Sequence, residues 1–185
     1  MNDVKYGFPY KKCYCEENVY MMGKKLKDEK KDSKLYAIFI SNENRSVVIY
    51  NQTSNESGVV CWDYHVVLLE INQSSSLIYD LDTRLSFPCD SKLYLLNCCP
   101  STIPKKYKCH FRVIEMSLYL DYFSSDRSHM KKLNGEYESS PPSWPIIKGD
   151  KAYTSNDINH FISIHSSILS HISSVLSLED INRFV

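Results

Sequence analysis

The chain has 185 residues, enough to bury a substantial hydrophobic core, and we expect one domain over residues 1–185. Lysine plus arginine and aspartate plus glutamate balance at 22 each, so the composition predicts no basic face for nucleic acid or anionic lipid. The sequence has no apolar run of about 18 residues and no apolar start, which argues against a transmembrane helix and a signal peptide.

Cysteine usage points to a reducing compartment. The odd number of seven cysteines, without a secretory signal, predicts reduced thiols in the cytosol or nucleus. Their spacings match no zinc-site pattern, and no histidine follows at the spacing of zinc ligands. We therefore expect neither a metal nor another cofactor.

Residues 1–12 predict an aromatic arm that lies on the surface or across a cleft. After it, Val19, Met22 and Leu26 recur at i, i+3 and i+7, which predicts an amphipathic helix running to about residue 31. Glu16 and Glu17 would occupy the first turn of this helix, where acidic side chains complement the positive end of the helix dipole.

Cys15 would lie at or just before that first turn. The unpaired backbone N–H groups there favour an anion, so we expect this position to lower the pKa of the Cys15 thiol and make it a nucleophile. The alternative is a buried structural cysteine beside a capping residue, because free cysteine is among the most buried residue types.

The rest of the chain predicts strands joined by turns and short helices. β-prone runs separated by turn residues predict strands over residues 35–41, 46–51, 59–71 and 76–82. The third run is apolar on both faces in its later part, as in a central strand covered on both sides. Beyond these strands we expect a helix over 90–97, a strand over 109–115, a helix over 117–123, a long polar loop to about residue 156, a helix over 157–162, a strand over 175–178 and a final helical turn. The predicted fold class is α/β or α+β, with a mainly antiparallel sheet on which helices pack.

A histidine and two aspartates fall on two consecutive predicted strands. Asp80 and Asp82 share one face of the second strand because side chains alternate. If residues 72–73 form the turn, His65 lies opposite Asp80; if residues 72–75 form it, His65 lies opposite Asp82, with Asp80 on the diagonal. Directly opposed Cβ atoms lie about 4.5–5.5 Å apart, so a carboxylate can hold the imidazole.

These residues together point to nucleophilic catalysis. His65 could take the proton of Cys15 and later return it to a leaving group, while a carboxylate orients the imidazole. Cysteine at a helix start, followed by histidine and aspartate on adjacent strands, is the order of papain-like and transglutaminase-like enzymes. Taken singly, His65 could be a core histidine bonded to a backbone carbonyl, and Asp82 a turn-forming residue.

Five short motifs stand out: Cys13-Tyr-Cys-Glu-Glu-Asn18, Trp62-Asp-Tyr-His-Val66, Tyr79-Asp-Leu-Asp-Thr83, Phe87-Pro-Cys89 and Ser125-Asp-Arg-Ser-His-Met130. In order and spacing they resemble the protein N-terminal glutamine amidohydrolases, from about Tyr10 to the closing Asn182-Arg-Phe184. Residues 90–108 and 163–174 depart from that pattern, so substrate contacts made there are not predicted.

The resemblance implies a cytosolic or nuclear enzyme that deamidates an N-terminal glutamine of proteins or peptides to glutamate and releases ammonia. The product could then be arginylated and degraded. The resemblance also implies Cys15 rather than Cys13 as nucleophile, His65 as base and Asp80 as its orienter, with a thioester intermediate. The implied fold is an α-β-α sandwich related to transglutaminases. We further expect a monomer without nucleic-acid or membrane partners.

Selectivity for a chain terminus requires a group that holds the substrate's α-ammonium, and a carboxylate suits it. The candidates are Glu16, Glu17 and Asp63, each with a structural alternative: helix-terminus charge for the glutamates and a local hydrogen bond for Asp63. Arg127 and His129 could shape the rim of the cleft or cap local backbone. The rival functions are a cysteine peptidase or transglutaminase using the same three residues, and a noncatalytic domain that binds N-termini.

Overall fold

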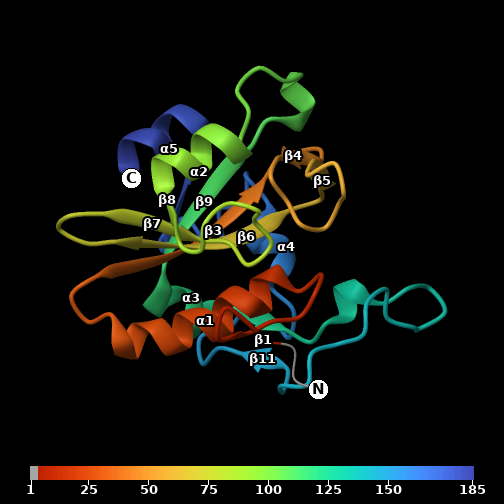
Figure 1. Cartoon of the computed structure of the whole chain (residues 1–185). Coiled ribbons are helices and arrows are strands. Elements are labelled where there is room, and N and C mark those ends of the chain that lie inside the picture. The colour runs from red at the N-terminus through yellow and green to blue at the C-terminus, as the bar shows by residue number, and fades with distance from the viewer. Residues whose placement is uncertain (1–3) are drawn as a thin grey trace.

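A six-stranded antiparallel sheet forms the centre of the computed structural model, which describes residues 4–185 (Figure 1). Its strands, in spatial order, are β12 (Ser173–Leu176), β9 (His110–Glu115), β3 (Lys34–Ser41), β6 (His65–Ile71), β7 (Ser76–Tyr79) and β8 (Cys89–Asp90). Each neighbouring pair runs antiparallel. The predicted α+β class with a mainly antiparallel sheet is confirmed.

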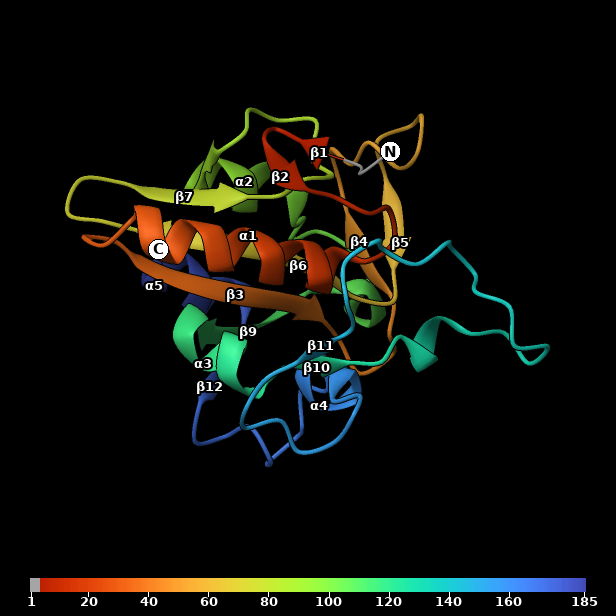
Figure 2. The same cartoon turned by 90° about the horizontal axis from the view of Figure 1, so that it is seen from below.

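Helices cover both faces of this sheet (Figures 1 and 2). One face carries α1 (Cys15–Glu29), α3 (Met116–Tyr122) and α4 (Ile158–Ile162), and the other carries α2 (Ser91–Cys98) and α5 (Leu178–Phe184). Each face has its own buried hydrophobic cluster. Phe39 of β3 belongs to the first cluster and the preceding Ile38 to the second, as the alternation of side chains along a strand requires.

Short elements flank the main sheet. They are the strand pairs β1 (Val4–Lys5) with β2 (Phe8–Pro9), β4 (Val47–Ile49) with β5 (Val60–Trp62), and β10 (Ser124–Ser125) with β11 (Ile147–Lys148), and the 3₁₀ helices η1 (Lys105–Tyr107) and η2 (Ser128–Met130). The first pair belongs to the expected aromatic arm, of which residues 1–3 lie outside the described residues. Tyr6 in this arm stacks on Phe87, with ring centroids 4.3 Å apart.

The structure corrects two predicted strands. The run over residues 59–71 is not one strand: it is divided into β5 and β6 by a bend at Asp63 and Tyr64. There the Asp63 carboxylate accepts a hydrogen bond from the Tyr64 backbone N–H at 3.0 Å, so a side chain replaces a strand partner. The predicted return strand over residues 46–51 does not pair with β3; its shorter form, β4, pairs with β5.

The hairpin of β6 and β7 has the longer of the two turns considered. Ile71 pairs with Ser76, so residues 72–75 form the loop, and Asn72 Oδ1 accepts the backbone N–H groups of Ser74 and Ser75. Extended further, this register would put His65 opposite Asp82. The strand β7 ends at Tyr79, however, so the chain is free to turn before it reaches that position.

Candidate active site

Cys15 is the first residue of α1, as predicted, and the approach to this helix is held firmly. The side chain of Asn18 accepts the backbone N–H of Lys11 at 2.8 Å and donates to its carbonyl at 2.9 Å. Tyr14 is fully buried, and its hydroxyl donates to the Ser139 carbonyl at 2.9 Å. Cys13, in contrast, is exposed and has a positive φ of 69°. The two cysteines therefore differ sharply in how well they are positioned.

The Cys15 thiol borders a cavity of about 430 Å³, a size typical of ligand pockets. Segments that are distant in the sequence form its wall: the start of α1, the bend between β5 and β6, the turn after β7, the segment from η2 to residue 139, and α4. The lining residues are Cys13, Cys15, Arg45, Trp62, Asp63, Tyr64, Asp82, His129, Met130, Glu138, Ser139, Ile158, Asn159 and Ile162.

His65 and Asp80 form a buried pair behind the cavity wall: neither is among the lining residues, but the His65 ring stacks on that of Trp62, which is. His65 Nε2 lies 2.9 Å from Asp80 Oδ1, and both side chains are almost fully buried. Asp80 reaches His65 although the register favours Asp82, because its Oδ1 also accepts the backbone N–H of Asp82 at 2.8 Å and so turns the chain. Gln52 Nε2 at 3.0 Å and the Tyr94 hydroxyl at 2.8 Å donate to the other carboxylate oxygen.

These contacts set the charges of the pair. Burial alone would raise the pKa of Asp80, but the charge and hydrogen bond of His65, together with hydrogen bonds from Gln52 and the Asp82 backbone, lower that pKa to about 2. Burial acts to lower the pKa of His65, but the charge and hydrogen bond of Asp80 outweigh it and raise this pKa above its usual value. Because Nε2 faces the carboxylate, Nδ1 is the ring nitrogen that remains for proton exchange.

The expected effect of the helix start on the Cys15 thiol is wrong. Removal from bulk water, followed by the charges of Glu16 and Asp82, raises the pKa of Cys15 well above its usual value, whereas a backbone hydrogen bond with Val66 lowers it. At this position burial and the neighbouring carboxylates affect the pKa of the thiol more strongly than the helix terminus does. The raised pKa favours the neutral thiol form of Cys15.

Glu17 has a structural role. It is fully buried, and its two carboxylate oxygens accept Nε and Nη2 of Arg127, each at 2.9 Å. Trp144 Nε1 at 2.7 Å and the Ser125 hydroxyl at 3.3 Å also donate to it. Its acceptor positions are thus occupied, and the geometry argues against Glu17 as a ligand for a substrate. Arg127 ties the segment near Trp144 to α1 and does not shape the cavity rim.

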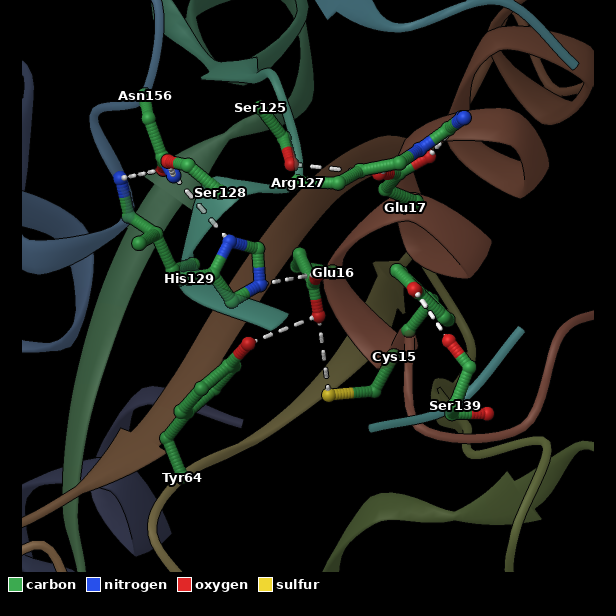
Figure 3. A network of polar contacts seen from close by, with 12 residues as sticks. Cys15, Glu16, Glu17, Tyr64, Ser125, Arg127, Ser128, His129, Ser139 and Asn156 are labelled. Carbon is green, nitrogen blue, oxygen red and sulfur yellow. Dashed lines mark hydrogen bonds and ion pairs between the residues drawn. The ribbon is translucent and has the colours of Figure 1, made fainter. Parts of the chain in front are cut away.

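Glu16 has a different environment, which Figure 3 shows. It is fully buried, and its Oε2 accepts the Tyr64 hydroxyl at 3.1 Å and the Cys15 thiol, whose sulfur lies 3.6 Å away. Its Oε1 makes no hydrogen bond and faces Nε2 of His129 at 3.4 Å. Glu16 thus lies directly behind three residues that line the cavity.

Asp63, the third candidate for binding the substrate's α-ammonium, lines the cavity and is exposed. Its Oδ1 holds the Tyr64 backbone N–H, the local hydrogen bond considered as the alternative. Sequence reasoning missed Asp82 as part of the cavity; its Oδ1 accepts the Tyr10 hydroxyl at 2.6 Å. The aromatic arm expected to cross a cleft is the signal that could have suggested this contact.

Two further findings concern residues 4–185 only. No cluster of three or more histidine, cysteine, aspartate or glutamate side chains suits a metal ion within this range. Nor does this part of the chain contain a helix long and apolar enough to cross a bilayer.

Comparisons with known proteins agree along most of the chain. A family model described as N-terminal glutamine amidase matches residues 10–185. A protein N-terminal glutamine amidohydrolase of Bos taurus is 42% identical over 166 residues, which are 86% of this chain and 79% of the bovine protein. The Homo sapiens protein of the same name is 40% identical over 166 residues, covering 86% and 80%. That of Caenorhabditis elegans is 39% identical over 148 residues, covering 77% and 79%. The region matched by the family model contains every residue that lines the cavity.

Proposed function

The chain belongs to the N-terminal glutamine amidase family and is a hydrolase that acts on amide bonds, and we propose that it deamidates N-terminal glutamine with Cys15, His65 and Asp80 as its catalytic residues. The observation that carries this proposal is the buried pair of His65 and Asp80, 2.9 Å apart. The His65 ring stacks on Trp62, and Trp62 lines the same cavity as Cys15 at the start of α1. A base with an orienting carboxylate next to a thiol is the arrangement that acyl transfer through a thioester needs.

The reaction begins at the side-chain amide of the substrate glutamine. Nδ1 of His65 takes the Cys15 proton as the sulfur attacks the δ-carbonyl carbon, and the carbonyl oxygen becomes an oxyanion. We infer that the backbone N–H of Cys15, at the start of α1, is one donor for this charge, because the N–H groups of a first turn have no partner within the helix. His65 then gives its proton to the departing nitrogen, so that ammonia leaves and a thioester remains.

Hydrolysis of the thioester completes the cycle. His65 takes a proton from water, the hydroxide adds to the thioester carbon, and the proton returns to sulfur as glutamate is released. Asp80 orients the imidazole and stabilises its charged form in both halves of the reaction. Its low pKa, about 2, keeps it ionised at any pH at which His65 titrates.

Recognition of the substrate's α-ammonium falls to a carboxylate near the thiol. Glu17 is disfavoured because its oxygens are occupied by Arg127, Ser125 and Trp144. Glu16 and Asp63 remain, the first fully buried with an unpaired oxygen and the second exposed at the cavity.

The cellular setting is also part of the proposal. We propose that the chain acts as a monomer in the cytosol or nucleus and that its glutamate product is arginylated and directs degradation. The seven cysteines, all free thiols in the structure, support a reducing compartment.

The test is ammonia release from three peptides that differ only at the start: glutamine, asparagine and acetylated glutamine. Only the first should be a good substrate. Acetylation leaves a buried carboxylate unpaired, at a cost of about 2–5 kcal/mol, which is tens to thousands of fold in kcat/KM. Asparagine places its amide one methylene short of the thiol, and misplacement by about an ångström costs on the order of a hundredfold.

Each rival function has its own outcome in this assay. A peptidase would cleave a peptide bond, a transglutaminase would release ammonia only with an added amine acceptor, and a binding domain would release none. Equal rates for the free and acetylated glutamine peptides would contradict recognition of a chain terminus.

A further inference from the structure

Two consecutive buried glutamates at the start of α1 differ in how their charge is balanced. Glu17 pairs with the guanidinium of Arg127 through two hydrogen bonds. Among residues 4–185, no lysine or arginine forms an ion pair with Glu16, although it is equally buried. An uncompensated carboxylate in a protein interior is costly, so its retention next to a cavity calls for a cationic partner that arrives from outside.

The nearest potential cation is His129, whose ring lies between Asn156 and Glu16. The side-chain nitrogen of Asn156 lies 3.3 Å from His129 Nδ1, and the same nitrogen donates to the Ser128 hydroxyl at 2.8 Å. Nε2 faces Glu16 Oε1 at 3.4 Å, and neither atom makes a hydrogen bond (Figure 3). This contact is therefore longer than the 2.9 Å ion pair of Arg127 with Glu17.

The other oxygen of Glu16 holds the nucleophile. Across residues 4–185, the side-chain hydrogen bond of the Cys15 thiol goes to Glu16 Oε2 and not to His65. Tyr64 donates to the same oxygen at 3.1 Å. Cys15, Tyr64 and His129 all line the cavity and contact Glu16, so they are the side chains that separate this carboxylate from the cavity.

We propose that Glu16 binds the α-ammonium of the substrate and, by doing so, releases the Cys15 thiol to His65. This inference rests on the proposed function and adds to it a means by which a free N-terminus switches on the nucleophile. In the resting enzyme Glu16 accepts the S–H hydrogen bond and disfavours a negative charge on sulfur. An ammonium at Glu16 replaces that hydrogen bond with N–H donors of its own and cancels the repulsion.

The proton balance of this switch is simple. The S–H hydrogen bond to Glu16 Oε2 breaks, an ammonium N–H hydrogen bond to the same carboxylate forms, and the thiol proton moves to Nδ1 of His65. His129 shifts from its loose contact with Oε1 to admit the ammonium. The substrate therefore brings a positive charge to Glu16, and an acetylated terminus cannot supply it.

The first test measures the thiol without turnover. Iodoacetamide alkylation of Cys15 is followed at pH 7.5 by mass spectrometry of the Cys15 peptide in wild-type protein, Glu16→Gln and Glu138→Gln. Glu138 also lines the cavity but is exposed, so this matched substitution controls for the loss of any carboxylate there. We expect alkylation about tenfold faster or more in Glu16→Gln and unchanged in Glu138→Gln, since lowering a pKa by one unit raises the thiolate fraction about tenfold.

A second arm keeps the native protein and therefore does not depend on whether Glu16→Gln folds. A peptide that begins with alanine carries the α-ammonium, but its first side chain is too short to cover the Cys15 thiol. At millimolar concentration it should accelerate alkylation of wild-type Cys15, whereas its acetylated form should not. Equal alkylation rates with the two peptides would overturn the proposal.

Kinetics complete the test. Glu16→Gln should lose most of the preference for a free over an acetylated N-terminal glutamine, and Glu138→Gln should keep it. If Glu16→Gln keeps that preference, another group such as Asp63 binds the ammonium and the proposal is wrong. If wild-type protein releases no ammonia from any peptide, the proposed function fails, while the alkylation results still decide whether Glu16 restrains Cys15.

Discussion

Replacing Asp80 by asparagine tests the proposed catalytic pair of His65 and Asp80 with almost no change of shape. The carboxylate accepts four hydrogen bonds: from His65 and the Asp82 backbone on one oxygen, and from Gln52 and Tyr94 on the other. An asparagine has one oxygen and one NH₂ group. Whichever way it is placed, its NH₂ faces two groups that donate to the carboxylate in the wild type, so these hydrogen bonds are lost or reversed.

The cost to stability follows from these contacts. The pKa of Asp80 is depressed to about 2 from its ordinary 3.8, so the carboxylate stabilises the fold at pH values above 3.8 and loses this contribution as the pH falls toward 2. At neutral pH that contribution is on the order of 2 kcal/mol, and each buried group left unsatisfied adds about 1–3 kcal/mol. Asp80→Asn should therefore unfold at a lower temperature than the wild type at pH 7, with the difference shrinking as the pH falls toward 3.

The cost to activity should be larger than the cost to stability. Without the carboxylate the imidazole can adopt the wrong tautomer and its charged form is not stabilised, which in triads of this kind costs about 10⁴-fold in kcat. The assay is ammonia release from a glutamine-initiated peptide at a temperature where the variant is folded by circular dichroism. Asp82→Asn is the control, because an asparagine there still accepts the Tyr10 hydroxyl. A folded Asp80→Asn enzyme within tenfold of wild-type kcat, or one more active than Asp82→Asn, would refute this reasoning.

Three more predictions follow from the site and the fold. Cys15→Ala should abolish ammonia release while Cys13→Ala keeps most of it, and equal losses in two folded variants would reverse the assignment. Because protonated His65 cannot accept a proton and its pKa is raised, kcat/KM should fall with decreasing pH around a midpoint above 6.5; a midpoint below 6.5 would indicate a thiolate–imidazolium pair instead. Gly149→Ala would place a Cβ 2.2 Å from the backbone oxygen of Asp121 and should cost about 1–3 kcal/mol in urea unfolding, so unchanged stability would show that this backbone yields easily.

The elements that the sequence predicted well are those set by local periodicity. The spacing of Val19, Met22 and Leu26 identified α1, and all three are buried in one cluster beneath it. Cys15 at the helix start could be predicted for the same reason. The strand ends were harder, because the bend after β5 depends on one side chain, Asp63, that bonds the next backbone N–H.

The partner of His65 could not be chosen from the strand pattern. Choosing it required the length of the turn, which the Asn72 side chain sets, and then a second turn in which Asp80 accepts the Asp82 backbone. The hairpin register alone would have selected Asp82. The choice of Asp80 came from the family resemblance, and the structure supplies its physical basis.

The roles of the two adjacent glutamates depend on contacts remote in sequence. Glu17 meets Arg127 across 110 positions, and Glu16 meets Tyr64 across 48. No local rule distinguishes the two residues, since both fit the first turn of a helix equally well. The wrong prediction for the pKa of Cys15 has a similar cause. The position at a helix start follows from neighbours along the chain, but the burial that raises this pKa depends on segments distant in the sequence.

The protonated state of Cys15 has a consequence for survival under oxidative stress. Peroxide attacks the thiolate far more readily than the thiol, and attack also requires access. At rest Cys15 is only partly exposed and its pKa is well above the usual value, so little thiolate is present to be oxidised. The proposed nucleophile is thus protected from oxidation in the idle enzyme, and a bound substrate would cover the sulfur during turnover.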